Sequence, residues 1–468
     1  MLTTEENEVL CRVGPDTPMG KVLRRYWTPA FQLADLPKPD CPPIRVTVLG
    51  ENFVAFRDTK GRLGFLDELC CHRGASLALG RVEDCGIRCI YHGWKFAVDG
   101  TILEMPNFPN STFKDRVKHG SYPVRESGGL GWVYLGPPGT EPPFPNFAWS
   151  DLPPEEIEVS EMILDCNWMQ VQEGSIDSSH VGVLHLDTLA VSDPGPRTVG
   201  SFQFAGEPWD LGLIPPRVSD PRGFGVEERN GNPQEGTPAR PARRGVGWPS
   251  TDNGPRIEVE YTPFGFHYAA IREVTGDPTK KYVRITAFVM PYTAFIAGAT
   301  GAIMVVPRDD YTCSSIIVSP VPKDAEGRPM RGLANRGIDP SVWGPEPERR
   351  RLRIPPQDRE AMAAGKSFAG FRGGNRIQDA AVQMSEGKLY DRRKEHLVPA
   401  DLAIIRLRRL LLDSVRLVEQ GKKPLGLGEG YDFTKVSGLS AVVSADTRWQ
   451  DLVPGHQGIP SRSSQVEA

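Results

Sequence analysis

The stretch CCHRGASLALGRVEDCGIRCIYHGWK, residues 70–95, constrains the fold of this chain more than any other part of the sequence. It contains four of the eight cysteines and two of the eight histidines. Cys70 and His72 are separated by one residue, and Cys89 and His92 by two. Thiolates and imidazoles together are ligands for zinc or for iron. The stretch therefore predicts a metal site that is formed by two loops.

The remaining composition indicates a globular protein in a reducing compartment. Hydrophobic residues make up 39% of the 468 residues and charged residues 24%, which is ordinary for such a chain. The N-terminal MLTTEENEVL lacks the apolar segment of a secretory signal, and no apolar run is long enough to span a bilayer. We expect a cytoplasmic protein with reduced thiols rather than disulfides. The net charge of −4 provides no electrostatic basis for binding nucleic acid or an anionic membrane.

The order of sequence patterns predicts an α+β protein with two main domains. Short alternating runs between Ile44 and Pro137, separated by Gly, Asp and Pro, are typical of a small antiparallel β domain. Near the end, DLAIIRLRRLLLDSVRLVEQG predicts a long amphipathic helix that ends at Gly421. The predicted parts are a helical lead (1–40), the β domain (41–150), a larger domain (151–446) with a Pro- and Arg-rich insertion (205–255), and a polar tail (447–468).

Two kinds of metal centre fit the paired Cys and His residues. They can close a tetrahedral zinc site, or they can hold a [2Fe–2S] cluster with two histidines on one iron, which is the Rieske arrangement. Zinc fingers mostly place like ligands together, whereas each pair here combines one cysteine with one histidine. Two such loops can offer both thiolates to one iron and both imidazoles to the other. The spacing therefore favours the Rieske cluster.

A second group of candidate ligands lies in EGSIDSSHVGVLH, residues 173–185. Asp177 and His180 are three residues apart, so a helix would place them on one face. His180 and His185 are five apart and converge only if the helix is distorted or interrupted, for which Gly182 is well placed. Two histidines and one carboxylate form the facial triad of non-haem iron(II) oxygenases. The segment therefore predicts a mononuclear iron site.

Together these motifs resemble the Rieske non-haem iron oxygenases that hydroxylate aromatic rings. CCHRGASL and CIYHGWKF are similar to the cluster-binding signatures of that family, although position 71 is cysteine where proline is usual. The resemblance leaves Cys71 and Cys85 outside the cluster. The cluster ligands that it implies are Cys70, His72, Cys89 and His92.

The same resemblance implies roles for the second motif. His180 and His185 would bind mononuclear Fe(II). Asp177 would not be a ligand but would bridge, through hydrogen bonds, an iron-binding histidine to a Rieske histidine, His92 (or His72), of a neighbouring subunit.

The carboxylate ligand would come from a helix late in the chain. Candidates are Asp379, Glu386 and Asp391, and Asp379 in IQDAAVQ matches the family best. An ordinary surface acid at a helix start is the alternative interpretation of Asp379, because acids are common there.

The segments VGPDTPMGKVLRRYWTPA, NWMQVQEGSIDSSH and QDAAVQMSEGKLYDRRKEHL are similar to the phthalate dioxygenase branch of the family. This likeness implies a helix-grip-like catalytic domain, an antiparallel sheet covered by helices. It also implies an α-only homotrimer or a hexamer of stacked trimers, supplied with electrons by a separate NADH-dependent flavin and iron–sulfur reductase. The sequence agrees in containing no strand–GxGxxG–helix motif for a nicotinamide cofactor.

The implied reaction is the hydroxylation of an aromatic, carboxylated, phthalate-like substrate with O₂. O-demethylation or ether cleavage of an aromatic acid is the alternative within the family. From other classes, a non-catalytic electron-transfer protein and a zinc-binding module also remain open.

An anionic substrate needs a cation in an otherwise apolar pocket. In FGFHYAAIREV, alternation places Arg272 on the same strand face as Tyr268, and in YVRITAFV it places Arg284 on the face of Tyr282. Arginine binds carboxylate through two hydrogen bonds, so Arg272 and Arg284 are candidate substrate-binding residues. Solvent-exposed arginines or subunit salt bridges are equally compatible with this pattern.

Overall fold

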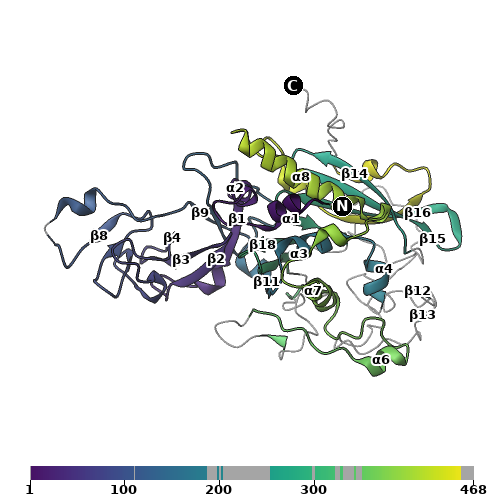
Figure 1. Ribbon diagram of the computed structural model, residues 1–468, viewed down its shortest axis with the longest axis horizontal. Coiled ribbons are helices and arrows are strands. Elements are labelled where there is room, and N and C mark those ends of the chain that lie inside the picture. Colours follow the sequence, from purple (N-terminus) through teal and green to yellow (C-terminus); the bar gives the residue numbers. More distant parts are fainter. Residues whose placement is uncertain are drawn as a thin grey trace.

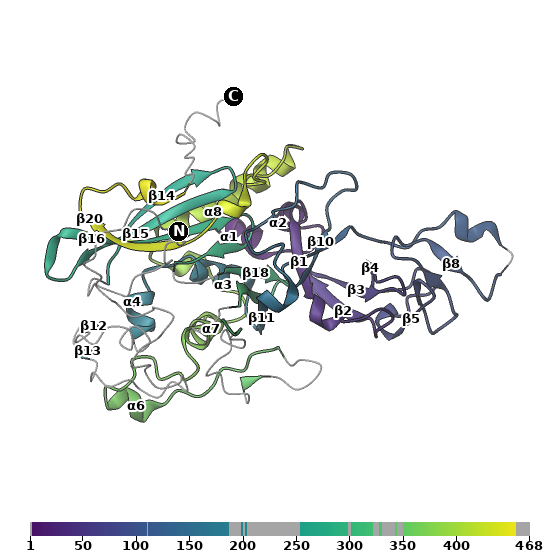
Figure 2. The same cartoon turned by 180° about the vertical axis from the view of Figure 1, so that it is seen from behind.

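The protein has two lobes along its longest axis (Figures 1 and 2). The computed structural model describes residues 2–109, 111–186, 198–199, 202–203, 253–297, 301–321, 327–329, 342–343 and 350–454. Almost all of the predicted insertion at 205–255, and residues 455–468 of the predicted tail, lie outside these ranges. Among the described residues, no helix is both long and apolar enough to cross a membrane.

The smaller lobe consists of short antiparallel strands, as the alternating runs predicted. The strands β2, β3 and β4 form one sheet and β5–β8 form another. Buried side chains of both sheets, such as Phe56 and Phe96, form one hydrophobic cluster that also includes Cys70 and Cys89. The two cysteines are therefore anchored in the core of this lobe. The strands are β2 (Ile44–Val48), β3 (Glu51–Arg57), β4 (Leu63–Asp67), β5 (Arg81–Glu83), β6 (Gly86–Arg88), β7 (Lys95–Phe96) and β8 (Ile102–Glu104).

The N-terminal segment contains a strand as well as helices. It folds as α1 (Thr4–Cys11), α2 (Pro18–Leu23) and β1 (Trp27–Gln32). β1 pairs with β10, in a three-stranded sheet whose third member is β9. The remaining strands of this sheet are β9 (Val124–Ser127) and β10 (Leu130–Tyr134).

The larger lobe contains an eight-stranded sheet in which every strand pair is antiparallel. The strand order is β11–β19–β18–β17–β16–β15–β14, and β20 pairs with β16. This sheet and its helices confirm the predicted α+β class. The strands are β11 (Ile157–Leu164), β14 (Arg256–Thr262), β15 (Gly265–Val274), β16 (Asp277–Val289), β17 (Thr293–Phe295), β18 (Ala302–Pro307), β19 (Cys313–Pro320) and β20 (Leu439–Ser444), and the separate pair is β12 (Thr198–Val199) with β13 (Phe202–Gln203).

Helices pack on this sheet and on each other. The helix α3 contacts β18, β19 and α7, and α8 contacts β14 and α2. The predicted amphipathic helix is α8, and Gly421, at φ +74°, follows its last turn as the sequence indicated. The helices of this lobe are α3 (Trp168–Ser175), α4 (Val181–Leu184), α6 (Arg359–Ala363), α7 (Asn375–Ser385) and α8 (Leu402–Glu419).

A buried ion cluster links Glu173 on α3 to Arg392 and to Arg408 on α8. Arg392 donates to both carboxylate oxygens of Glu173, over 2.9 and 3.0 Å, and Arg408 donates to the same carboxylate over 2.7 Å. All three side chains are buried. Burial alone would raise the pKa of Glu173, but the two guanidinium groups hold it below its usual value. The Glu173 carboxylate is therefore charged, and it serves as a counterion for both Arg392 and Arg408.

We expect Glu173→Gln to lower the free energy of unfolding by about 3–5 kcal/mol, because it leaves buried guanidinium charge without a full counterion. The midpoint of urea denaturation, followed by circular dichroism, measures this loss. Asp413→Asn on α8 is the matched control, since Asp413 pairs with Arg416 at the surface and such pairs contribute little. Equal midpoints for the two variants would contradict the expectation.

Candidate active site

Two loops of the smaller lobe are closed in the same way. In the first loop, the amide of Gly74 donates to the carbonyl of Cys70 over 2.8 Å, and in the second Gly93 donates to Cys89 over 3.0 Å. Both glycines have positive φ, +73° and +76°, a conformation that other residues adopt at a cost. Each loop thus begins with a buried cysteine and presents one histidine before its glycine.

Two cysteines and two histidines of these loops differ in burial. Cys70 and Cys89 are buried, at 3% and 2% exposure, while His72 and His92 are partly exposed. The two imidazole rings lie with their centroids 4.5 Å apart. Among the described residues, none offers a hydrogen-bond partner to the buried Nδ1 of His92, so this atom is available as a metal ligand. Two inner thiols and two outer imidazoles fit a [2Fe–2S] group.

The other two cysteines of the stretch lie in different surroundings from Cys70 and Cys89. Cys71 is exposed, and Cys85 lies in a turn between β5 and β6 at φ +62°. All eight cysteines of the chain are free thiols.

The predicted helix through Asp177 and His180 is wrong. α3 ends at Ser175, and Asp177 precedes a separate one-turn helix, α4, for which His180 and His185 are the capping residues. The reason is local: the Asp177 carboxylate accepts hydrogen bonds from the backbone amide and the hydroxyl of Ser179, over 2.7 and 2.8 Å. Such a turn competes with continuation of the helix.

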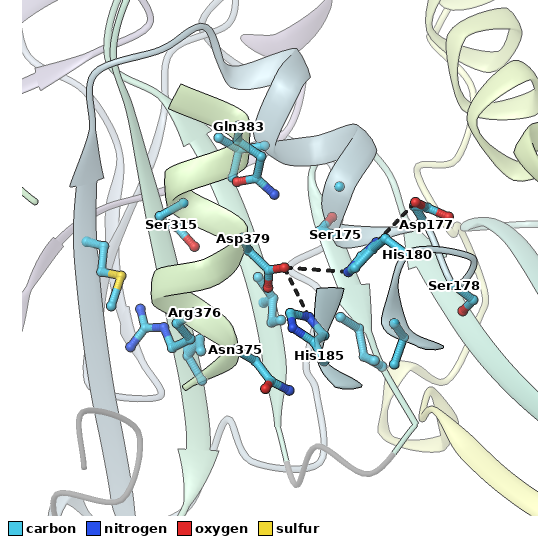
Figure 3. A pocket seen from close by; sticks show the side chains of 18 of the residues that line it. Ser175, Asp177, Ser178, His180, His185, Ser315, Asn375, Arg376, Asp379 and Gln383 are labelled. Atoms are coloured by element: carbon cyan, nitrogen blue, oxygen red, sulfur yellow. Dashed lines mark hydrogen bonds and ion pairs between the residues drawn. The ribbon is translucent and has the colours of Figure 1, made fainter. Parts of the chain in front are cut away.

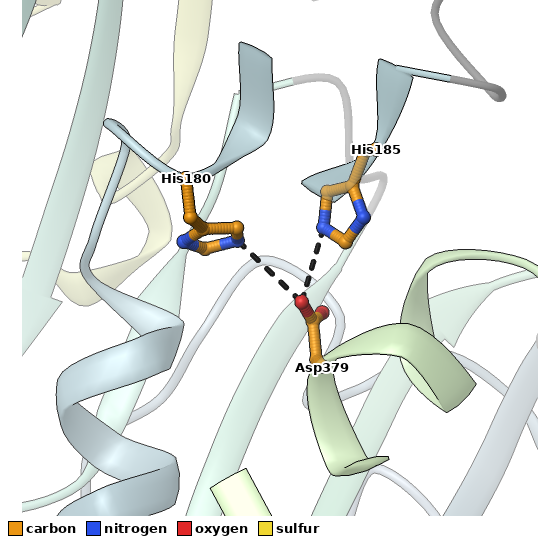
Figure 4. Close-up of side chains that lie close together, drawn as sticks. All are labelled: His180, His185 and Asp379. Carbon is orange, nitrogen blue, oxygen red and sulfur yellow. Dashed lines mark ion pairs between the residues drawn. The ribbon is translucent and has the colours of Figure 1, made fainter. Parts of the chain in front are cut away.

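The short helix brings the two histidines together, and α7 adds the carboxylate of Asp379 (Figure 4). Oδ1 of Asp379 lies 3.1 Å from Nε2 of His185 and 3.5 Å from Nε2 of His180. One ligand atom from each residue lies within 4.8 Å of the others. Two imidazole nitrogens and a carboxylate oxygen that converge in this way could hold a divalent iron ion.

The second nitrogen of each histidine is already engaged. Nδ1 of His180 lies 3.0 Å from the carboxylate of Asp177, and Nδ1 of His185 lies 2.7 Å from the amide oxygen of Gln378. Because each Nδ1 faces an acceptor, each Nε2 is left for a metal.

Asp379 and His180 shift each other's pKa values. Burial would raise the pKa of Asp379, but the two histidines hold it well below its usual range. Burial would lower the pKa of His180, but hydrogen bonds to Asp177 and Asp379 raise it to about 9. A site that attracts a proton this strongly attracts a metal cation in its place.

A cavity of about 380 Å³ opens on the three residues (Figure 3). Its walls are mainly apolar and come from β11, β15, β16, β18, β19, α3, α4 and α7, with Met162, Val171 and Ile303 among them. A cavity of this size and character suits a small aromatic molecule.

The two predicted substrate arginines lie at different places. β15 and β16 pair Arg272 with Tyr282 and Ala270 with Arg284, so the two arginines share one sheet face. Arg284 lines the cavity. Arg272 does not; it is buried and donates to the carbonyl of Ser178 over 2.7 Å, which supports the loop after Asp177.

Sequence reasoning missed two residues of α7. Arg376 lines the cavity and donates to Ser160, and Gln378 contacts His185. Arg376 is three residues before Asp379, so a helical pattern would have placed both on one face. Gln378 gives no such signal. The other acids considered for the iron, Glu386 and Asp391, lie beyond the last turn of α7 and do not line the cavity.

The chain belongs to the Rieske non-haem iron oxygenases. Residues 26–123 match the Rieske [2Fe-2S] domain, and residues 133–205 and 237–461 match the LigXa C-terminal domain like family. Along almost its whole length it is similar to oxygenase subunits. It is 36% identical to the phthalate 4,5-dioxygenase oxygenase subunit of Pseudomonas putida, over 96% of this chain and 94% of that protein.

Other relatives carry out related chemistry. The 3-chlorobenzoate-3,4-dioxygenase oxygenase subunit of Comamonas testosteroni is 32% identical, over 97% of this chain and 99% of that protein. The 5,5'-dehydrodivanillate O-demethylase oxygenase subunit of Sphingobium sp. is 30% identical, over 91% and 83%. Among solved structures, Pseudomonas putida CBB5 NdmA with caffeine has the same fold, with a TM-score of 0.51 at 15% identity, over 92% of this chain and 100% of that one.

Family membership decides among the functions that the sequence left open. The chain is an oxygenase component, an enzyme that uses O₂ and a Rieske [2Fe–2S] cluster together with mononuclear iron. Its electrons come from a separate reductase that supplies the NADH and flavin chemistry. The zinc-binding module and the non-catalytic electron carrier are thereby excluded.

Proposed function

We propose that this oxygenase acts on an aromatic acid, and that His180, His185 and Asp379 hold its mononuclear iron. The observation that carries the iron assignment is the convergence of three ligand atoms within 4.8 Å at the wall of an apolar cavity. In the smaller lobe, the proposed cluster ligands are Cys70, His72, Cys89 and His92. Iron, when bound, supplies the activation of O₂; the protein supplies ligands, orientation and a dry pocket.

The substrate class is supported by two cations in the cavity. Arg284 on β16 and Arg376 on α7 both line it, and the walls between them are largely apolar. Arg376 is half-buried, and desolvation lowers the pKa of its guanidinium to about 10 even though Asp379 and Glu158 act in the opposite direction. A substrate carboxylate would restore the solvation that Arg376 has lost. The phthalate and chlorobenzoate named for two relatives are aromatic acids.

We expect Arg376→Met and Arg284→Met each to raise the KM for an aromatic dicarboxylate by about 10–100-fold, the value of a hydrogen bond to a charged group. Substrate-dependent O₂ uptake with a surrogate reductase measures this, and the dimethyl ester is the neutral comparison. Arg372→Met, an exposed arginine paired with Asp358 outside the cavity, is the control variant. Equal loss for acid and ester would contradict a carboxylate-binding role.

The reaction at the ring can take two forms, and products distinguish them. Hydroxylation retains every carbon of the substrate, whereas O-demethylation of a methoxylated aromatic acid releases formaldehyde. The O-demethylase relative keeps the second outcome open. Dihydroxylation of an unsubstituted carboxylated ring is the form proposed here, and formaldehyde release with a methoxylated acid in preference to phthalate would replace it.

Electrons are proposed to enter at the cluster and to reach the iron of a neighbouring subunit through His92 (or His72) and Asp177. The lobe that holds the cluster loops, around β4 and β8, lies far along the long axis from α4 in both views (Figures 1 and 2). Apolar side chains beside the cluster histidines are exposed, including Ile90 at 59% and Tyr91 at 55%. An exposed apolar patch of this kind suits contact with another protein surface.

A homotrimer, alone or stacked as a hexamer, is the proposed assembly, because a closed ring lets each cluster lobe reach the next catalytic lobe. We also propose a cytoplasmic location, which the eight free thiols support.

A further inference from the structure

We propose that Gln378 is a positioning residue that orients His185 toward the mononuclear iron. The inference rests on the proposed metal site of His180, His185 and Asp379 and concerns a residue that touches neither the metal nor the cavity. Its amide oxygen lies 2.7 Å from Nδ1 of His185. An amide oxygen can only accept, so Nδ1 of His185 carries the proton and Nε2 presents its lone pair.

The environment of Gln378 indicates that this hydrogen bond is the reason for a polar residue at the position. Its side chain is completely buried, at 0% exposure. Within the described part of the chain, its amide nitrogen has no hydrogen-bond partner. Burying an NH₂ group without a hydrogen-bond partner is unfavourable. The hydrogen bond between the amide oxygen of Gln378 and His185 offsets this cost and accounts for a glutamine at this position.

The two histidines are therefore held by different groups. Nδ1 of His180 is hydrogen-bonded to the carboxylate of Asp177, whereas Nδ1 of His185 is hydrogen-bonded to the neutral amide of Gln378. Gln378 also precedes Asp379 directly on α7, so one helix supplies both a ligand and the residue that orients a second ligand. A shift of α7 would therefore move Asp379 and the hydrogen-bond partner of His185 together. Hydrogen bonds of this kind fix the ring orientation and the tautomer of metal-binding histidines.

The test is the affinity of the full-length protein for Fe(II), with the Rieske cluster intact and the mononuclear site emptied by a chelator. Gln378→Met keeps the length of the side chain but removes the acceptor, and it should weaken Fe(II) binding by about 10–100-fold. Gln378→Glu restores an acceptor, and it should bind Fe(II) at least as tightly as the natural protein.

Gln383→Met is the matched control. Gln383 is a buried glutamine on the same helix, and its side chain makes no hydrogen bond to His185 or His180 within the described structure (Figure 3). Its substitution should leave Fe(II) affinity within about twofold, well inside the effect of a ligand-orienting residue. Circular dichroism reports whether each variant is folded, and the absorption of the Rieske cluster reports that the smaller lobe is intact. If Gln378→Met fails to fold, Gln378→Asn, whose amide is one methylene too short to reach His185, takes its place with the same expectation.

The outcomes separate two failures. If the natural protein binds no Fe(II) at the emptied site, the proposed metal site is wrong. If the natural protein binds Fe(II) but the methionine variant binds it equally well, or the glutamate variant binds as weakly as methionine, the role of Gln378 is overturned.

Discussion

Asp379→Ala should lose the mononuclear iron and all turnover while it retains the Rieske cluster. The carboxylate of Asp379 is the point at which Nε2 of both histidines converge, at 3.1 and 3.5 Å. Removing it leaves two neutral imidazoles and no anionic ligand for a divalent cation. The loss of Fe(II) affinity should exceed the about 10–100-fold that follows the loss of a ligand's hydrogen-bond partner, because a ligand itself is gone. Iron analysis by mass spectrometry measures the metal, and electron paramagnetic resonance of the reduced protein measures the cluster.

Glu386→Ala and Asp391→Ala are the controls, since both acids were alternative ligands on sequence grounds. Asp391 pairs with Arg393 at the surface, and Glu386 follows the last residue of α7. Neither substitution should change iron content. Retention of iron in Asp379→Ala, with its loss in either control, would move the third ligand elsewhere. Loss of the cluster in Asp379→Ala would show that the two metal centres are not independent.

The sequence could predict those elements whose pattern of apolar residues lies within a single segment of the chain. Alternating apolar residues gave the strands β2, β3 and β4, and helical spacing followed by Gly421 gave α8. The pairing of β1 with β10 was not predicted, because it joins Trp27 to Tyr134 across more than a hundred residues and leaves no periodic trace.

In the candidate site, too, residues within one short motif could be predicted from the sequence, whereas contacts between distant segments could not. Spacing suggested His180 and His185, resemblance to a family was needed to assign them as ligands, and the same resemblance was needed to prefer Asp379 among three acids. The helix expected at Asp177 was wrong because the carboxylate binds the amide of Ser179, a competition that residue spacing does not record. Gln378 could not be predicted, since its partner His185 is 193 residues away.

Asp177→Asn should leave both metal centres in place and lower turnover by about 100-fold or more, the upper end of what loss of a ligand's hydrogen-bond partner costs. In the natural protein Oδ1 of Asp177 accepts from Ser179, whereas Oδ2 faces Nδ1 of His180. Asparagine can keep its one oxygen toward Ser179, so the geometry of the loop survives, and its amide nitrogen then faces His180 in place of Oδ2. What it removes is the negative charge between His180 and the proposed cluster histidine of the next subunit. Rapid mixing of the reduced protein with substrate and O₂ measures the rate at which the cluster is reoxidised.

Ser179→Ala is the control for Asp177→Asn. It removes one hydroxyl hydrogen bond to the carboxylate but leaves the amide contact, so reoxidation should stay near the natural rate. Reoxidation of Asp177→Asn at the natural rate would remove Asp177 from the electron path. Loss of mononuclear iron in that variant would instead make Asp177 a structural support of His180.

Mixed oligomers extend the Asp177 prediction to the subunit boundary. His92→Ala should disable the cluster. Asp177→Asn should block the transfer of electrons to the iron of its own subunit. Each variant alone should therefore have little activity. In a ring formed from equal amounts of both, about one quarter of the interfaces join an intact cluster to an intact iron site, if each cluster serves only the next subunit. Co-expressed mixtures should therefore regain about that fraction of the natural activity. If electrons instead passed within one chain, no subunit of the mixture would hold both intact parts, and activity would remain absent.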